Sequence, residues 1–135
     1  MTEAGQEPHR SLLIIDDDSL IRVLLHTALQ RHYDVLCVPN GLDVPGVIAS
    51  RKPDLIVLDI HLPGSDNFEL CAGIRDQAAL QRAPILFMTV CRDERGFFES
   101  LKTNGNSYIR KPFKIPELKR KIEGMLNPAP QSGPI

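Results

Sequence analysis

The chain has 135 residues, a length that suits one compact domain rather than two. With 42% hydrophobic and 24% charged residues, its composition is typical of a soluble globular protein. A formal net charge of −1 argues against a large nucleic-acid or anionic-membrane surface, and no apolar run approaches the roughly 20 residues that span a bilayer. The polar N-terminus, MTEAGQEPHR, lacks the pattern of a secretion signal, and the three cysteines have neither disulfide nor metal-ligand spacing. We therefore expect a cytoplasmic protein with reduced cysteines.

Short apolar runs alternate along the chain with segments of helical periodicity. The runs that predict strands are, in chain order, residues 12–15, 33–38, 55–58, 85–89 and the surroundings of 108–109. This alternation is typical of βαβ units, so we expect an α/β fold in which five strands and five helices form a doubly wound (βα)5 sandwich. We expect residues 1–10 to be a flexible lead, residues 11–126 the folded domain, and the Pro- and Gly-rich residues 127–135 a tail or linker.

The helices are predicted from apolar residues that share one face. These residues are Ile21, Leu24, Leu25 and Ala28 in the first helix, Phe97 and Leu101 in the fourth, and Leu118, Ile122 and Met125 in the fifth. Pro45 and Gly46 suit only the first turn of the second helix, so we expect Asp43 to be its N-cap. The spacing of Asp66 and Glu69 predicts a capping pair at the start of the third helix.

Polar side chains stand at or just after the ends of four expected strands. Asp16 and Asp17 follow the first strand, Asp59 follows the third, Thr89 ends the fourth, and Lys111 follows the fifth. In an open α/β sheet, the functional crevice lies at the carboxyl ends of the strands. We therefore expect one edge of the sheet to gather three carboxylates, a hydroxyl and an ammonium group.

Three converging carboxylates would raise one another's pKa unless a cation lies between them. Mg²⁺ prefers carboxylate oxygens and also binds phosphate oxygens, and Lys111 and Thr89 would add a positive charge and a hydroxyl donor. Such a pocket suits a phosphoryl group, and one carboxylate would then be its acceptor. Asp59 is the best candidate, because it stands alone after Leu58 whereas Asp16 and Asp17 are placed as metal ligands.

These motifs resemble the receiver domain of two-component response regulators. The matching residues, in the order and spacing of that family across residues 10–126, are Asp16-Asp17, Asp59 within DIHLPG, Thr89, Tyr108 and the triplet Lys111-Pro112-Phe113. The resemblance implies a flavodoxin-like fold of three layers, with a parallel sheet in the order 2-1-3-4-5. It also implies a signalling domain, not an enzyme, which accepts a phosphoryl group on Asp59 from a histidine kinase or a histidine phosphotransfer protein.

The resemblance also implies a set of Mg²⁺ ligands. Asp17 and Asp59 would bind the ion directly, Asp16 would act largely through water, and His61 would contribute its backbone carbonyl. Lys111 would contact the phosphoryl group. We expect the His61 side chain to face solvent beside the pocket, and Asp18 to be an N-cap or surface residue.

A switch and its partners are implied by the same resemblance. Thr89 would move toward the phosphoryl group and Tyr108 would swing inward behind it, and the Lys111–Pro112 peptide is commonly cis in the family. The face formed by the fourth helix, the fifth strand and the fifth helix would be a partner or homodimer surface. A C-terminal output domain could follow the Pro-rich end, whereas these residues themselves have no motif for contacting nucleic acid and no membrane segment.

Two residues depart from the family pattern. Asn67 stands where glycine is usual, and asparagine tolerates the left-handed backbone best among other residues. Val90 stands where a small residue is usual, and its branched side chain would narrow access to Asp59. Val90 motivates an alternative, a degenerate receiver that serves as a docking or dimerisation module. A Mg²⁺-dependent phosphohydrolase is disfavoured, because no cap insertion is present and no acidic residue stands two positions after Asp59.

Overall fold

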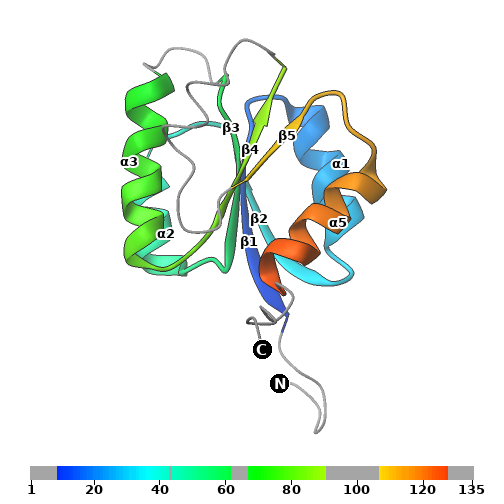
Figure 1. Ribbon diagram of the computed structural model, residues 1–135, viewed down its shortest axis with the longest axis horizontal. Coiled ribbons are helices and arrows are strands. Elements are labelled where there is room, and N and C mark those ends of the chain that lie inside the picture. The colour runs from blue at the N-terminus through cyan, green and yellow to red at the C-terminus, as the bar shows by residue number, and fades with distance from the viewer. Residues whose placement is uncertain (1–8, 43, 62–66, 91–106, 128–135) are drawn as a thin grey trace, which may run out of the picture.

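The computed structural model describes residues 9–42, 44–61, 67–90 and 107–127. Its five parallel strands form one sheet in the order β2-β1-β3-β4-β5. The strands are β1 (Arg10–Ile15), β2 (Tyr33–Val38), β3 (Leu55–Asp59), β4 (Ile85–Thr89) and β5 (Ser107–Arg110). Helices α2 (Val44–Arg51) and α3 (Asn67–Leu80) cover one face, and α1 (Ser19–Leu29) and α5 (Ile115–Leu126) cover the other (Figure 1).

The α/β class, the three layers and the strand order expected from the sequence are confirmed. The helix expected around Phe97 and Leu101 lies outside the described residues, as do the expected caps Asp43 and Asp66. Within the described part of the chain, no helix is both long and apolar enough to cross a membrane.

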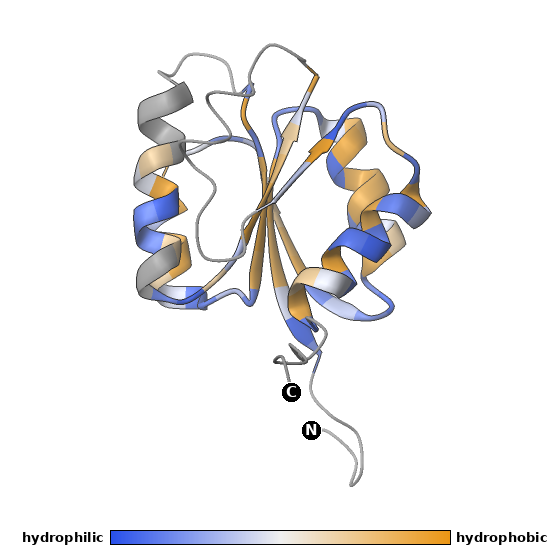
Figure 2. Ribbon diagram, viewed as in Figure 1, coloured by the Kyte–Doolittle hydropathy of each residue, from blue (hydrophilic) through white to orange (hydrophobic). Residues whose placement is uncertain are grey.

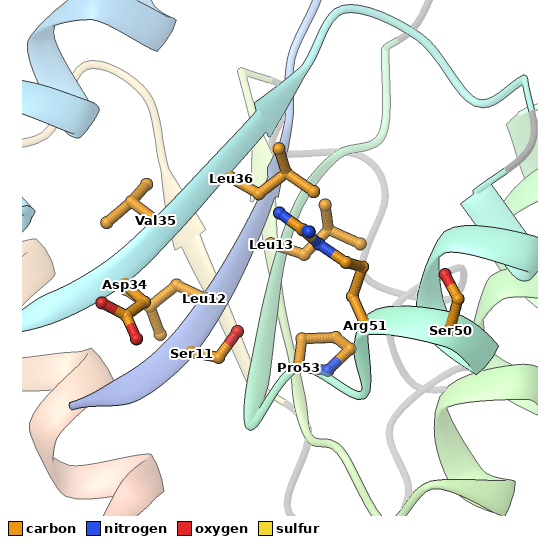
Figure 3. Close-up of a pocket in the computed structure, with 9 residues that line it drawn as sticks. All are labelled: Ser11, Leu12, Leu13, Asp34, Val35, Leu36, Ser50, Arg51 and Pro53. Carbon is orange, nitrogen blue, oxygen red and sulfur yellow. The ribbon is translucent and has the colours of Figure 1, made fainter. Parts of the chain in front are cut away.

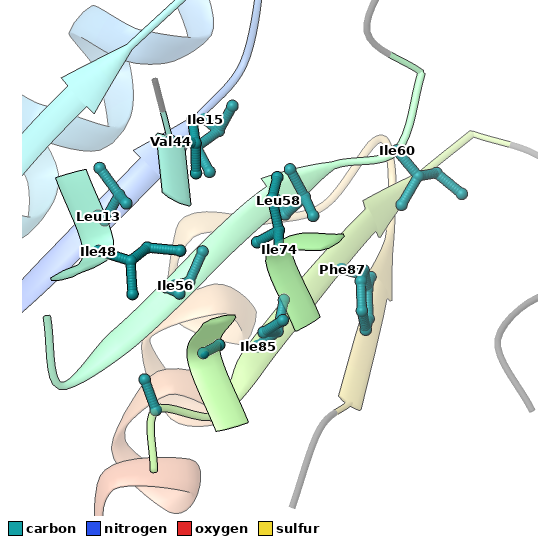
Figure 4. Packing of buried hydrophobic residues seen from close by; sticks show 12 residues of the cluster. Leu13, Ile15, Val44, Ile48, Ile56, Leu58, Ile60, Ile74, Ile85 and Phe87 are labelled. Carbon is teal, nitrogen blue, oxygen red and sulfur yellow. The ribbon is translucent and has the colours of Figure 1, made fainter. Parts of the chain in front are cut away.

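Both faces of the sheet are packed, so its central strands are apolar in both directions. β3 and β4 are buried at every position. Alternate residues of β1 belong to two separate clusters: Leu13 and Ile15 pack with residues of α2 and α3 (Figure 4), and Leu12 and Ile14 pack with residues of α1 and α5. Figure 2 accordingly shows hydrophobic residues concentrated in the strands. Burial of each such Leu or Ile side chain stabilises the folded state by about 1.5–3 kcal/mol relative to an exposed side chain.

The first strand starts earlier than the apolar run predicted. β1 begins at Arg10, which lies opposite Tyr33 in the parallel register. The Arg10 guanidinium donates hydrogen bonds to the backbone carbonyl of Leu126 at 3.1 Å and to Asn127 Oδ1 at 3.3 Å. Arg10 therefore belongs to the sheet and connects the beginning of β1 to the end of α5, although the sequence analysis had placed it in the lead.

The inward face of α1 differs by one residue from the expected stripe. Leu25 and Leu29 are fully buried, but Leu24 is 46% exposed, so the prediction that Leu24 faces the core is wrong. Leu20 and Val23 are exposed as well. Because this helix is apolar on more than one side, periodicity alone does not select the buried face.

Candidate functional site

Three polar side chains are buried at the carboxyl edge of the sheet. Asp16 follows β1, Asp59 ends β3 and Thr89 ends β4, and these strands are neighbours in the order β1-β3-β4. Their exposed fractions are 0%, 4% and 1%, and among the described residues they are the buried polar or charged ones. Burying polar groups is costly unless they are compensated, so their concentration at one edge indicates a functional site.

The acidic residues expected to converge do so. Asp16, Asp17 and Asp59 each offer a carboxylate oxygen, and these oxygens all lie within 4.8 Å of one another. Asp17 is exposed and therefore forms the open side of the cluster. Burial raises the pKa of Asp16 above its ordinary value, and the charge of Asp59 adds to this effect, while hydrogen bonds from Lys111 and from the Asp18 backbone oppose it.

Lys111 places its ammonium group between two of these carboxylates. Its Nζ donates to Asp16 Oδ2 at 2.8 Å and to Asp59 Oδ2 at 3.3 Å. Burial alone would lower the pKa of Lys111, but its hydrogen bonds to the two carboxylates and their charges raise it above the ordinary value. Lys111 therefore stays positively charged at neutral pH. Its backbone N–H donates to the Thr89 carbonyl, and the Lys111–Pro112 peptide is cis.

The turn after β1 is held by hydrogen bonds to Asp16 and Asp18. Asp16 Oδ1 accepts the Asp18 N–H at 2.9 Å, and Asp18 Oδ1 accepts the Leu20 N–H at 2.9 Å. The latter bond confirms Asp18 as the N-cap of α1. Arg22 Nη1 donates to the Asp16 backbone carbonyl at 2.8 Å. Sequence reasoning missed Arg22; its signal was a cation one helical turn after the acidic run.

His61 contacts the site through both its backbone and its ring. Its backbone N–H donates to Asp59 Oδ1 at 2.9 Å, and its ring Nε2 lies 3.4 Å from Thr89 Oγ1. The ring is exposed, as expected, but it also contacts a buried side chain of the site. The prediction that the side chain faces solvent beside the pocket is therefore confirmed.

The two remaining residues of interest are both exposed. Tyr108, in β5, has 49% of its surface exposed and lies opposite Phe87 of β4 in the register. Val90 has 61% of its surface exposed, so the protein does not enclose its methyl groups. An exposed Val90 narrows the access to Asp59 less than a buried valine would.

One hollow among the described residues lies away from the acidic cluster. A cavity of about 490 Å³ lies between β1, β2 and the end of α2, where Ser11, Asp34, Arg51 and Pro53 are among its lining residues (Figure 3). These residues lie toward the amino ends of the strands or at the end of α2, and none of them belongs to the acidic cluster. The candidate site is therefore the polar edge and not this cavity.

Comparison with known proteins agrees with this geometry. Residues 12–123 match the response regulator receiver domain, and the chain belongs to this family. It is 36% identical over 121 residues to the transcriptional regulatory protein GltR of Pseudomonas aeruginosa, covering 89% of this chain and 50% of GltR. It is 32% identical over 130 residues to the phosphate regulon regulator PhoB of the same organism, covering 93% of this chain and 57% of PhoB. The chain thus spans about half the length of the curated relatives it matches.

Solved structures show the same fold. The chemotaxis protein CheY4 of Vibrio cholerae is similar with a TM-score of 0.77 and 22% identity, covering 88% of this chain and 100% of that one. The receiver domain of the sensor histidine kinase PA1611 of Pseudomonas aeruginosa has a TM-score of 0.75 and 24% identity, covering 89% and 99%. That receiver domain has a magnesium ion coordinated in its active-site cleft. The family match identifies the chain as a receiver domain of response regulators, a signalling domain, and the solved structures agree with it in fold.

Proposed function

We propose that this receiver domain accepts a phosphoryl group on Asp59 from a histidine kinase or a histidine phosphotransfer protein, and thereby switches an interaction surface. One observation carries the proposal: Asp59, Asp16 and Thr89 are buried together, and Lys111 binds both carboxylates. This arrangement provides a nucleophile, a cation and a hydroxyl donor within one small polar site. The domain would be a phosphoacceptor and not an enzyme that turns over a separate substrate.

The donor set fits Mg²⁺. Oxygen ligands suit this ion, and three carboxylate oxygens lie within 4.8 Å of one another. Asp17 and Asp59 would hold the ion directly, Asp16 would act largely through water, and His61 would contribute its backbone carbonyl. When bound, Mg²⁺ supplies positive charge that lets the carboxylates stay ionised and neutralises phosphoryl oxygens. The magnesium ion in the cleft of the PA1611 receiver domain supports this assignment.

The transfer is a displacement at phosphorus. A carboxylate oxygen of Asp59 forms the new bond to phosphorus, and the bond from phosphorus to the donor's imidazole nitrogen breaks. The electron pair of the broken bond remains on that nitrogen, which takes a proton from solvent, and the product on Asp59 is an acyl phosphate. Lys111, already 3.3 Å from Asp59 Oδ2, would then bind a phosphoryl oxygen.

The switch would use two adjacent strands. The added phosphoryl oxygens require donors, and the hydroxyl of Thr89 at the end of β4 would move to supply one. Tyr108 on the neighbouring β5 would then turn inward from its half-exposed position. Phosphorylation would shift the population between two existing arrangements and alter the face formed by the fourth helix, β5 and α5. We propose this face as a homodimer or partner surface.

The proposal also covers the segments that flank the domain, an output domain and the cellular location. GltR and PhoB are transcriptional regulatory proteins of about twice the aligned length. The expected receiver unit, residues 11–126, is extended by Arg10, the first residue of β1. We propose that residues 1–9 precede it as a lead and that residues 127–135 link it to an output domain. The cysteine content favours the cytoplasm as its location.

Intact mass spectrometry tests the phosphoacceptor directly. The protein is incubated with Mg²⁺ and acetyl phosphate beside two variants, Asp59→Asn and Asp34→Asn, the second removing an exposed aspartate on β2. We expect one phosphoryl adduct in the parent and in Asp34→Asn, and none in Asp59→Asn. Absence of an adduct with every donor, including phosphorylated histidine proteins, would contradict the proposal and favour a docking module. Repeated turnover of a phosphomonoester without a lasting adduct would favour a hydrolase.

A further inference from the structure

Arg22 reaches back from α1 to the acidic turn through both its backbone and its side chain. Its N–H donates to the Asp18 carbonyl at 3.0 Å, which is the first hydrogen bond along the helix. Its Nη1 donates to the Asp16 carbonyl at 2.8 Å, and the side chain is half-buried there. The backbone bond is expected of any residue at this position, but the guanidinium bond is specific to arginine.

The guanidinium of Arg22 supplies the last of the hydrogen bonds that hold Asp16 in place. The Asp16 N–H donates to the Val38 carbonyl at 3.2 Å, its Oδ1 accepts the Asp18 N–H, and its Oδ2 accepts from Lys111. With Arg22 on its carbonyl, every polar group of Asp16 has a partner. A carbonyl oxygen and the next N–H lie in one rigid peptide plane, so the bond from Arg22 also sets the orientation of the peptide that leads to Asp17.

Asp17 depends on this support more than its neighbours do. Asp59 is held by the His61 N–H and by Lys111, whereas the Asp17 side chain has no hydrogen bond or ion pair within the described residues. The backbone therefore fixes the position of its Cβ, and with it the set of directions that the carboxylate can take. An exposed carboxylate on an unsupported turn would lose side-chain and backbone entropy when it binds an ion.

We propose that Arg22 is a positioning residue for the metal site, which holds the Asp16–Asp17 peptide so that the Asp17 carboxylate faces Asp59. This inference rests on the proposed function, because it requires that Mg²⁺ binds at the acidic cluster. Groups that orient metal ligands without touching the metal typically change its affinity by about 10–100-fold when they are removed. The planar, permanently charged guanidinium holds a carbonyl with less loss of freedom than an ammonium on a flexible chain.

Calorimetric titration with magnesium chloride tests the inference. The titration compares the parent protein with Arg22→Ala, Arg22→Gln, Arg22→Lys and a control, Arg31→Ala, which removes an exposed arginine just after α1. We expect about tenfold weaker Mg²⁺ binding in the alanine and glutamine variants. The lysine variant should recover only part of the affinity, because its ammonium is held less rigidly, and the control should match the parent. Should Arg22→Ala not fold, Arg22→Gln carries the comparison.

A double-mutant cycle separates positioning from general support of the fold. If Arg22 acts through Asp17, its removal should have little effect on the residual affinity of an Asp17→Asn background. Equal Mg²⁺ affinity in the parent and in folded Arg22→Ala and Arg22→Gln, even with a lower Tm in EDTA, would overturn the inference. Failure of the parent itself to bind Mg²⁺ would instead overturn the proposed function.

Discussion

At the scale of single residues, Asp16 is subject to two opposing effects: burial disfavours its charged form, and its hydrogen bonds favour it. Its carboxylate is fully buried, and burial raises its pKa although Lys111 and the Asp18 N–H stabilise the ionised form. A carboxyl whose pKa is higher in the folded than in the unfolded protein favours folding when it is protonated. Its favourable contribution is complete below the unfolded pKa of about 3.9 and is lost as the pH rises through the folded pKa.

Asp16→Asn should therefore stabilise the metal-free protein at neutral pH. In urea unfolding with EDTA, we expect a higher free energy of unfolding for the variant at pH 7 and a smaller difference in acid, where Asp16 of the parent is protonated. The same variant should bind Mg²⁺ about tenfold more weakly, because it loses a charge that orients the ion's water. A variant less stable than the parent at pH 7 would mean that the contact with Lys111 outweighs desolvation.

The sequence predicted which residues meet at the site but not all of their contacts. Asp16, Asp59 and Thr89 were predictable because parallel strands bring their carboxyl ends to one edge, whatever the side-chain conformations are. The contacts of Arg22 with Asp16 and of the His61 ring with Thr89 depend on side-chain rotamers and on the path of a turn. Residue types and spacing do not specify those.

At the scale of elements, helix α1 connects the site to the rest of the fold. Asp18 begins the helix by accepting the Leu20 N–H, and it lies directly after Asp16 and Asp17 of the acidic cluster. Ser, Thr, Asp and Asn are the side chains that best satisfy these first amide groups. The same short stretch must therefore both begin a helix and present a carboxylate.

Asp18→Ala should lower the free energy of unfolding by about 1 kcal/mol, because a first-turn N–H loses its acceptor. Asp18→Asn should keep most of the stability, since its side-chain oxygen can accept the same bond. Urea unfolding in EDTA measures both without contribution from a metal. An alanine variant as stable as the parent would show that solvent replaces the cap at no cost.

Burial explains part of the accuracy of the predicted elements. The bounds of β4 were confirmed, and β3 differed only by the inclusion of Asp59, because strands packed on both faces are short, continuous apolar runs. The bounds of β2 were confirmed as well, although this edge strand is only partly buried. In β5 only Ile109 is buried, so the apolar pattern predicted the centre of this strand but not its bounds. On α1 the exposed Leu20, Val23 and Leu24 competed with the inward stripe, and this competition caused the error at Leu24.

At the scale of the whole molecule, we expect metal binding to raise the melting temperature of the domain. A ligand that binds only the folded state stabilises it by about 2.7 kcal/mol at a concentration 100 times Kd, and for a domain of this size that raises Tm by roughly 10 °C. We expect such a rise when Mg²⁺ replaces EDTA. The rise should persist in Asp34→Asn and disappear in Asp17→Asn. Identical melting curves in Mg²⁺ and in EDTA would contradict a metal site.

The connection of Arg10 to Leu126 and Asn127 has a practical consequence for experiments on this protein. It fixes the beginning of β1 beside the end of α5, at the margin of the sheet remote from the carboxylates (Figure 1). A fluorophore, affinity handle or fused reporter joined before residue 9 or after residue 127 will depart from that remote margin. Either attachment therefore starts away from the acidic cluster, and a pair of dyes placed at both points reports on the distance between the beginning of β1 and the end of α5.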